Sequence, residues 1–292
     1  MQSTVGTPVF TPPNNHPCWI ELSSPDVTAA RAFYGGLLGW EFTEPGPMGF
    51  GLTALKDGAR VAGISPQPAD APEGQPAFWS VYFRVGSLDD FVAAVSDAGG
   101  QPMMAIPEFD GTAGVALVAD PAGTAFGVLE YPDERGFTTL DVTGAPAWFE
   151  LHTKDFTVRE FYARTFGWEF TVDGDTDDFR YASFALGAAG DDSGTTDAQS
   201  PMVGGVLDNS RFPIPAHWES YLRVDDVDAL VPRVQELGGA VLTEPHDSLH
   251  GRVGRFIDSQ NAAFTVIGPN TDSPAEAPAG GEQTGGEPTA GA

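Results

Sequence analysis

The chain has 292 residues, 41% of them hydrophobic, which is enough for two domains that each bury a core. Acidic residues outnumber basic ones by 41 to 14, giving a formal net charge of −27. A field of that sign repels phosphate backbones and anionic lipids, so we expect no nucleic acid and no membrane as partners. The charge would attract a cationic ligand, or it serves solubility alone.

The cysteine content and the N-terminal residues bear on the compartment. Cys18 is the only cysteine, so no internal disulfide can form. The first 17 residues lack the basic and apolar segments of a signal peptide. No run approaches the roughly 20 apolar residues of a membrane span. We expect a cytoplasmic protein that is a monomer or a homodimer.

One stretch of the first half returns in the second half. Residues 17–42, PCWIELSSPDVTAARAFYGGLLGWEF, reappear as residues 146–170, PAWFELHTKDFTVREFYARTFGWEF. Each copy alternates like a strand and then predicts a helix. In the first copy the helix begins after Asp26 and ends at Gly39. The chain is therefore predicted to be a duplication.

Further elements complete each half. Strand-like runs at 50–55 and 60–64 precede a strand at 78–85, a helix from Ser87 to Gly99, and two strands around an Asp-Pro-Ala-Gly turn at 120–123. The second half repeats the order, after a Gly/Asp/Ser/Thr-rich insert at 186–200 that is typical of a solvent loop. We expect an α+β fold of four βαβββ modules in two pairs.

The domain boundaries follow from the repeat and from composition. We expect a flexible N-terminus at 1–15, a first domain at 16–131, a linker at 132–145 and a second domain at 146–269. Residues 271–292 contain no aromatic or large aliphatic residue, so the tail at 270–292 is expected to be disordered.

These segments resemble the vicinal oxygen chelate superfamily, which includes glyoxalases, bleomycin-resistance proteins and extradiol dioxygenases. The resemblance covers 17–268 and is carried by the Asp, Phe-Tyr and Gly-Trp-x-Phe spacing and by the Asp-Pro-Ala-Gly turn. It implies two glyoxalase-like domains, each with a curved mixed sheet around a cup. It does not fix the function, because the superfamily hosts lyases, oxygenases, epimerases, thiol transferases and drug binders.

Enzymes of this superfamily usually build a metal site from His, Glu or Gln at four strand positions of a cup. By the resemblance, these positions fall at Trp19, Gly63, Ser80 and Gly127 in the first half and at Trp148, Gly205, Glu219 and Thr265 in the second. One carboxylate out of four cannot hold a catalytic divalent ion. We therefore expect no metal and no cofactor.

Aromatic side chains and glycines stand where ligands would be. We expect the walls of the cups to be Trp19, Tyr82, Trp148 and Tyr221, and the glycines at 63, 127, 204 and 205 to leave floor space. Such a slot suits a planar apolar molecule held by stacking, although the same rings could fill a dead cavity. The other tryptophans are expected in the core (Trp40, Trp168) or against the helices (Trp79, Trp218).

Polar residues share the strand faces of the two leading tryptophans. Residues two apart on a strand point to one face, so Glu21 accompanies Trp19, while Glu150 and His152 accompany Trp148. Glu21 with Arg84, and Glu150 with Arg223, could form structural ion pairs, or a glutamate could meet a ligand amine or hydroxyl. Cys18 is expected on the opposite face of its strand.

The second half holds a richer polar set. Glu150, His152, His217 and Glu219 could converge in one cup, transfer protons or bind a metal in a displaced site, although each histidine could also be structural. His246 and His250 are expected in a loop beside the cup mouth, and His16 in the flexible start.

The leading hypothesis is a metal-independent protein that binds a bulky planar aromatic natural product, such as an anthracycline-like drug or intermediate. It would act in sequestration and self-resistance, or as an accessory to a biosynthetic oxygenase. The candidate ligand-binding residues are Trp19, Glu21, Tyr82, Trp148, Glu150, His152 and Tyr221. The alternatives are an acid/base isomerase or lyase, or a metal-assisted oxygenase, that uses Glu150, His152, His217 and Glu219, and a degenerate scaffold whose cups are filled.

Overall fold

A computed structural model describes residues 10–43, 51–108, 113–131, 135–176, 179–187 and 202–271. Within these ranges the strands form two mixed sheets of eight strands, and each sheet is built from one half of the chain. The strand orders are β2-β3-β4-β1-β5-β8-β7-β6 and β10-β11-β12-β9-β13-β16-β15-β14, so the two halves have the same topology. The predicted α+β fold of two paired modules per domain is confirmed.

The first half contains two modules of one helix and four strands. Its order is β1 (Pro17–Ser24), α1 (Val27–Leu38), β2 (Glu41–Thr43), β3 (Leu52–Lys56), β4 (Ala59–Pro66), β5 (Phe78–Arg84), α2 (Leu88–Asp97), β6 (Gln101–Ile106), β7 (Gly114–Ala119) and β8 (Ala125–Glu130). Asp26 caps α1 by accepting bonds from the backbone of Thr28 and Ala29, and the left-handed Gly39 ends it. Both helix ends lie where the sequence predicts them.

The second half repeats this order with small changes. It contains β9 (Pro146–Thr153), a 3₁₀ turn (Phe156–Val158), α3 (Arg159–Phe166), β10 (Glu169–Asp175), β11 (Arg180–Ala185), β12 (Gly204–Asp208), β13 (His217–Arg223), α4 (Val227–Glu236), β14 (Ala240–Ser248), β15 (Gly251–Ile257) and β16 (Ala263–Gly268). Most of the predicted insert at 186–200 and of the predicted tail lies outside the described residues. Among the described residues, no helix is long and apolar enough to cross a membrane.

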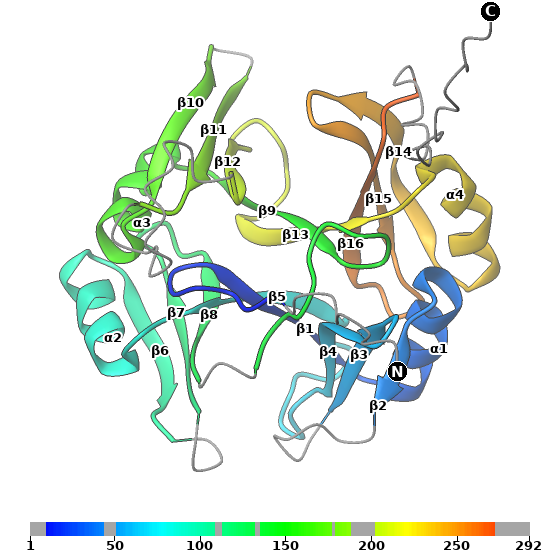
Figure 1. The fold of residues 1–292 in the computed structure, drawn as a ribbon, viewed down its shortest axis with the longest axis horizontal. Helices are drawn as coiled ribbons and strands as arrows, with labels where there is room; N and C mark the ends of the chain where they lie inside the picture. The colour runs from blue at the N-terminus through cyan, green and yellow to red at the C-terminus, as the bar shows by residue number, and fades with distance from the viewer. Residues whose placement is uncertain are drawn as a thin grey trace, which may run out of the picture.

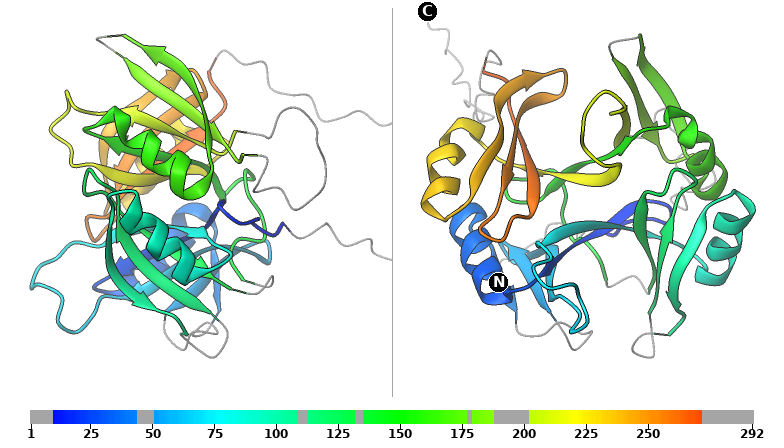
Figure 2. Two further views of the ribbon diagram at one scale, coloured as in Figure 1. Left: turned by 90° about the vertical axis from the view of Figure 1, so that its left-hand side faces the viewer. Right: turned by 180° about the vertical axis from the view of Figure 1, so that it is seen from behind.

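The two sheets pack back to back through their central strands, and their outer strands splay away in opposite directions (Figure 1). Helix α1 lies beside α4 at one flank, and α2 lies beside α3 at the other, as the opposite view also shows (Figure 2). Apolar side chains of both halves form one continuous core between the sheets. We call the outward concave face of the first sheet, which carries Trp19, the first cup, and that of the second sheet, which carries Trp148, the second cup.

The repeated Tyr and Asp residues join the two halves. The Tyr34 hydroxyl of α1 donates to Asp258 of the second half over 3.1 Å, and it accepts a bond from Nε1 of Trp79 over 3.0 Å. The equivalent Tyr162 donates to Asp120 of the first half over 3.0 Å. Since both tyrosines are fully buried, each motif contributes a buried polar contact across the domain interface.

The tryptophans that follow the helices also bond across the halves. Nε1 of Trp40 donates to the carbonyl of Gly144 over 2.6 Å, and Nε1 of Trp168 donates to the carbonyl of Asn15 over 2.8 Å. Both rings are buried, as predicted. Trp79 and Trp218 lie on the helix side of their sheets, which is also the predicted side.

The N-terminal segment and the linker both contribute residues to the packed structure. The backbone N–H of Asn15 donates to the carbonyl of Arg84, and the carbonyl of Asn15 accepts a bond from Nε1 of Trp168, so this residue contacts both halves. His16 is largely buried, and burial lowers its pKa to about 4. In the linker, Phe137 is fully buried between the rings of Trp19 and Phe149. Apolar side chains in these segments explain why they pack.

Candidate functional site

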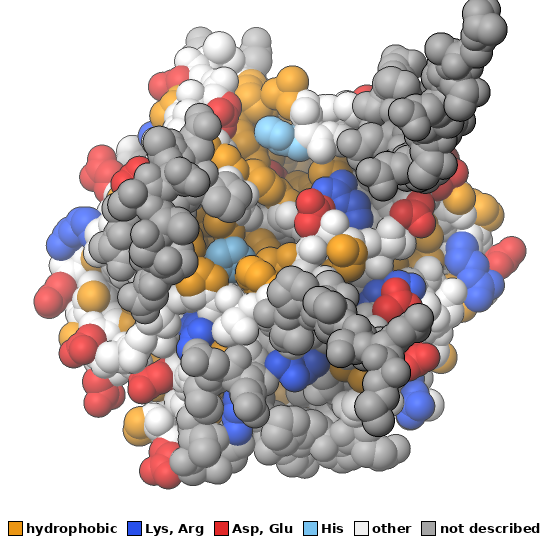
Figure 3. Space-filling view, viewed as in Figure 1, with side chains coloured by type: hydrophobic (Ala, Val, Ile, Leu, Met, Phe, Trp, Pro, Cys, Tyr) orange, Lys and Arg blue, Asp and Glu red, His pale blue; other side chains and the backbone are white. Residues whose placement is uncertain are grey.

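The second cup contains a cavity of about 260 Å³. Strands β9 and β11 to β16, the residue before β11 and the β14–β15 turn supply its lining, which consists of Trp148, Glu150, Phe179, Tyr181, Leu207, Tyr221, His246, Ser248, Leu249, His250, Val253 and Ile267. In the space-filling view, hydrophobic side chains gather in the hollow of this half, with histidine side chains among them (Figure 3). The cavity is an aromatic and aliphatic slot with few polar groups, as in many small-molecule sites.

Flat rings line one side of this cavity and reach its mouth. Trp148 stacks on His250, with ring centroids 5.7 Å apart and planes inclined by 22°. Phe179 stacks on Tyr181 at 5.9 Å, and Tyr181 also lies 5.9 Å from His250. His246 and His250, both expected in a loop beside the mouth, line the cavity, but His246 belongs to strand β14 and only His250 lies in the turn. These rings offer stacking surfaces to a planar guest.

Glu150 forms the polar floor of the cavity. The hydroxyl of Tyr221 donates to its Oε1 over 2.8 Å, and the hydroxyl of Tyr181 donates to its Oε2 over 2.9 Å. Nε1 of Trp148 in turn donates to the Tyr181 hydroxyl over 3.1 Å. Burial and the charge of Glu150 raise the pKa of both tyrosines well above 10, so the hydroxyls keep their protons. The carboxylate is 6% exposed and is held rigidly.

His152 lies between two buried carboxylates. Its Nε2 is 2.9 Å from Oε1 of Glu150 and 3.4 Å from Oε2 of Glu219, off the hydrogen-bond direction to either. Its ring stacks on that of His217, with centroids 4.7 Å apart. Burial lowers the pKa of His152, but the two carboxylates outweigh burial and raise the pKa overall. All four candidate acid/base residues of the second cup therefore come together.

Glu219 is bound by a cation that the sequence reasoning did not identify. Arg255 Nε donates to Oε1 of Glu219 over 3.1 Å, and the hydroxyl of Thr265 donates to the same oxygen over 2.7 Å. Burial alone would raise the pKa of Glu219, but His217, His152 and Arg255 lower it to about 2. Since the nearest nitrogen of His217 lies 3.8 Å from the carboxylate, we regard the direct bonds of Arg255 and Thr265 as the stronger cause.

A metal does not fit the four positions that the superfamily resemblance assigns in the second cup. Trp148 donates to Tyr181, Thr265 donates to Glu219, and the space above Gly205 is taken, since a Cβ there would lie 2.0 Å from the Tyr181 hydroxyl oxygen. Glu219 is the single strong ligand among the four, and one carboxylate is too few for a divalent ion.

A displaced metal site among the neighbouring residues meets a different obstacle. In the part of the chain that the structure describes, the His, Cys, Asp or Glu group with mutually close ligand atoms consists of His152, His217 and Glu219, within 4.8 Å of one another. Nδ1 of His217 lies 2.9 Å from the Pro215 carbonyl, which only accepts, so Nδ1 carries the proton. Nε2 is then an acceptor, and it lies 3.1 Å from an Arg255 nitrogen. The guanidinium thus occupies the lone pairs that a metal would need.

The first cup has a different floor. The Glu21 carboxylate accepts a bond from Nε1 of Trp19 over 2.7 Å and another from the hydroxyl of Ser65. Burial raises the pKa of Glu21 to about 7, because these two neutral donors compensate only part of the desolvation. The Trp19 ring lies 5.8 Å from that of Phe137, which packs it against the linker.

The expectation that glycines leave empty floor space is wrong at the described positions. A Cβ on Gly63 would lie 1.8 Å from Oε2 of Glu21, and a Cβ on Gly127 would lie 2.1 Å from the Tyr82 ring. Gly204 faces the core instead, where a Cβ would lie 2.6 Å from the Phe184 ring. The glycines make room for side chains of this chain, and in the second cup for Tyr181.

The predicted Glu–Arg ion pairs are replaced by other bonds. Arg84 donates to the carbonyls of Pro12 and Tyr131, and Arg223 pairs with Asp141. Cys18 also departs from expectation, since it packs with Tyr131 beside Trp19 and Tyr82. A register shift between Pro17 and Trp19 in β1 explains this, because a bulge changes which side the next residue faces. Cys18 is fully buried, and burial raises the pKa of its thiol to about 12, so the thiolate that would act as a nucleophile is disfavoured.

The sequence reasoning missed several site residues. Phe179 precedes strand β11 and Tyr181 lies in it, and no predicted strand range covers these two residues. Arg255 is one of two arginines in β15. The alternation of β15 could have identified Arg255. Arg255 pairs with Thr265 and Val253 pairs with Ile267, so Arg255 and Val253 point to the same face of the sheet.

Comparisons with known proteins agree with this architecture. The sequence profile of the Glyoxalase/Bleomycin resistance protein/Dioxygenase superfamily matches residues 17–128. A Mycobacterium tuberculosis protein with a provisional glyoxylase name, CFP32, is 36% identical over 262 residues, which cover 87% of this chain and 94% of that protein. The chain belongs to this superfamily. The anthracycline biosynthesis protein DnrV of Streptomyces peucetius is 34% identical over 269 residues, covering 86% of this chain and 92% of that protein.

Solved structures of the superfamily share the fold. The Mn(II)-bound glyoxalase from Novosphingobium aromaticivorans aligns with a TM-score of 0.56 at 15% identity, covering 89% of this chain and 85% of that one. A variant of homoprotocatechuate 2,3-dioxygenase from B. fuscum aligns with a TM-score of 0.58 at 14% identity, covering 93% and 77%. At this identity the likeness concerns the fold and not the chemistry.

Proposed function

We propose that the protein binds a planar, polycyclic aromatic natural product in the second cup without a metal ion. It would act by sequestration, or as an accessory to a biosynthetic oxygenase whose product it removes. The observation that carries the proposal is the ring-lined cavity of about 260 Å³ above Glu150. The similarity to DnrV, named as an anthracycline biosynthesis protein, supports an anthracycline-like ligand.

The polar floor of the cavity supports a ligand that donates hydrogen bonds. Tyr181 and Tyr221 both donate their hydroxyl hydrogens to Glu150, so their oxygens and the carboxylate can only accept further hydrogen bonds. Phenolic hydroxyls or a protonated amine on the ligand would meet these acceptors. The net charge of −27 favours a cationic ligand over an anionic one.

The candidate residues then divide between the two cups. In the second cup, Trp148 and Tyr221 would stack on or flank the ligand, and the positive charge of His152 would stabilise the Glu150 carboxylate. In the first cup, Trp19, Glu21 and Tyr82 would have a structural role, since Glu21 and Tyr82 fill the space that Gly63 and Gly127 leave.

The duplication provides a matched test of this division. Chelator-treated full-length protein is titrated with a hydroxyanthraquinone while tryptophan fluorescence is followed. We expect saturable quenching in the wild type, an affinity at least tenfold weaker in Trp148→Ala, and no change in Trp19→Ala. Equal effects of the two substitutions, or the absence of quenching in the wild type, would overturn the proposal.

One observation favours an enzyme as a second candidate. His152 contacts both Glu150 and Glu219, and a histidine with a raised pKa can hold and release a proton. An acid/base isomerase or lyase would change the bound molecule. Mass spectrometry and chromatography of the ligand after incubation separate the two functions: a binder returns the ligand unaltered, whereas an enzyme yields a product that Glu219→Gln no longer makes.

A further inference from the structure

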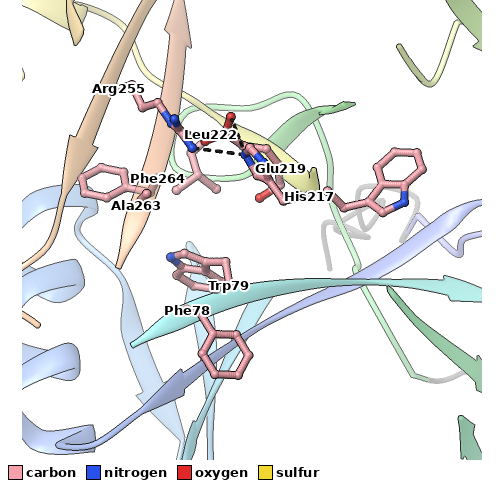
Figure 4. A pocket seen from close by; sticks show the side chains of 10 residues that line it. Phe78, Trp79, His217, Glu219, Leu222, Arg255, Ala263 and Phe264 are labelled. Atoms are coloured by element: carbon pink, nitrogen blue, oxygen red, sulfur yellow. Dashed lines mark hydrogen bonds and ion pairs between the residues drawn. The ribbon is translucent and has the colours of Figure 1, made fainter. Parts of the chain in front are cut away.

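A second cavity lies between the two domains, outside the slot of the second cup. It has a volume of about 180 Å³ and opens between β5 of the first half and the β13, β15 and β16 strands of the second. Figure 4 shows Trp79 on β5 facing Leu222 and Phe264 across it, with Arg255 and Glu219 at one side, while the ring of Phe78 lies on the opposite side of β5. Boundaries between domains are frequent places for small-molecule sites.

The size and lining of this interdomain cavity suit one aromatic ring. A cavity of about 150 Å³ lined by aliphatic and aromatic groups is known to take up benzene. Here the rings of Trp79 and Phe264 and the side chains of Leu222 and Ala263 contribute to the apolar wall.

The polar side of the interdomain cavity has mixed charge. Arg255 and Glu219 are paired at 3.1 Å, so an anion would meet the carboxylate and a cation would meet the guanidinium. Ser220 adds a hydroxyl to the lining. A neutral group that both donates and accepts a hydrogen bond matches such a wall, and a phenolic hydroxyl is the smallest such group on a ring.

We propose that the interdomain cavity is a second binding site, which takes a neutral phenol with its ring between Trp79 and Phe264 and its hydroxyl against the Arg255–Glu219 pair. This site shares His217, Glu219 and Arg255 with the polar cluster of the second cup, but none of the aromatic residues that line the second-cup cavity lines the interdomain cavity.

The test uses the indole resonances of the full-length protein as position-specific reporters. Phenol is titrated into ¹⁵N-labelled protein, and the Nε1 signals of Trp79 and Trp148 are followed. We expect a saturable change in the chemical shift of the Trp79 signal and no change in that of the Trp148 signal. Benzoate, which has the same ring and a negative charge, is expected to bind at least tenfold more weakly.

A cavity-filling variant and its counterpart complete the test. Ala263, at the start of β16, lines the cavity, and Ala125 stands at the equivalent start of β8. Ala263→Leu is expected to weaken phenol binding at least tenfold, and Ala125→Leu to leave it unchanged. A shift of Trp148 instead of Trp79, no shift of either signal, or tighter binding of benzoate than of phenol would each overturn the proposal.

Discussion

Replacing Arg255 by methionine tests whether a guanidinium stands in the second cup where a metal would otherwise bind. Methionine keeps an unbranched apolar stem and removes the charge and the donors. Glu219 and His217 then lose the cation that bonds both of them at 3.1 Å. We expect the Arg255→Met variant to be less stable at neutral pH and to bind a divalent cation.

The expected loss of stability follows from the pKa of Glu219. Its fall from 4.5 to about 2 in the folded protein corresponds to about 3 kcal/mol at 1.36 kcal/mol per pKa unit. Because the pKa is lowered, this stabilisation is complete above pH 4.5 and is lost as the pH falls towards 2. Arg255 shares the effect with the two histidines, so we expect its removal to cost about 2 kcal/mol at pH 7.

The assay is urea unfolding followed by zinc titration calorimetry. Arg180→Met is the matched control, because Arg180 lies 45% exposed in a surface ion pair and its loss should cost less than about 1 kcal/mol. We expect Arg255→Met to bind zinc at least tenfold more tightly than the wild type, and the added substitution His152→Ala to abolish the gain. An unchanged zinc affinity in Arg255→Met would refute the reasoning.

Three further substitutions probe other parts of the account. Burial raises the pKa of Glu21 to about 7, so keeping this carboxyl ionised destabilises the folded state fully above pH 7 and not at all below pH 4.5. Glu21→Gln should therefore raise the free energy of unfolding at pH 8 by at most about 3 kcal/mol and leave it unchanged at pH 4. Tyr34→Phe and Tyr162→Phe should each lower it by about 1–3 kcal/mol and by similar amounts, since each leaves a buried aspartate short of a donor. Gly205→Ala places a Cβ 2.0 Å from the Tyr181 hydroxyl oxygen, so it should weaken hydroxyanthraquinone binding while the circular dichroism spectrum stays native.

The outcomes that would contradict these expectations are distinct. A Glu21→Gln effect that is the same at pH 4 and pH 8 would mean that the carboxylate is not destabilised by burial. Strongly unequal losses in the two tyrosine variants would mean that the two interdomain contacts are not equivalent. Unaltered ligand affinity in Gly205→Ala would remove Tyr181 from the site.

The sequence predicts the features that depend on local pattern. Helix α1 begins after Asp26 and ends at Gly39 because an aspartate caps a helix start and a glycine tolerates the left-handed end. Strand alternation places Trp79 and Trp218 on the helix side and Glu150 with His152 on the cup side. The duplication predicts two equivalent sheets, and the structure has them.

Features that depend on contacts between distant strands are not predictable in this way. Whether Gly205 leaves a hole depends on the rotamer of Tyr181, a residue more than twenty positions earlier. The identity of the cation at Glu219 depends on which arginine of β15 faces the cup. The side that Cys18 faces depends on a register shift in β1, which alternation alone does not reveal.

The most direct test of metal-independent binding is calorimetric titration of a hydroxyanthraquinone into the full-length protein, with and without a chelator. The account predicts one ligand per chain and the same dissociation constant in both conditions. Binding that disappears with the chelator and returns on addition of a divalent metal would contradict it.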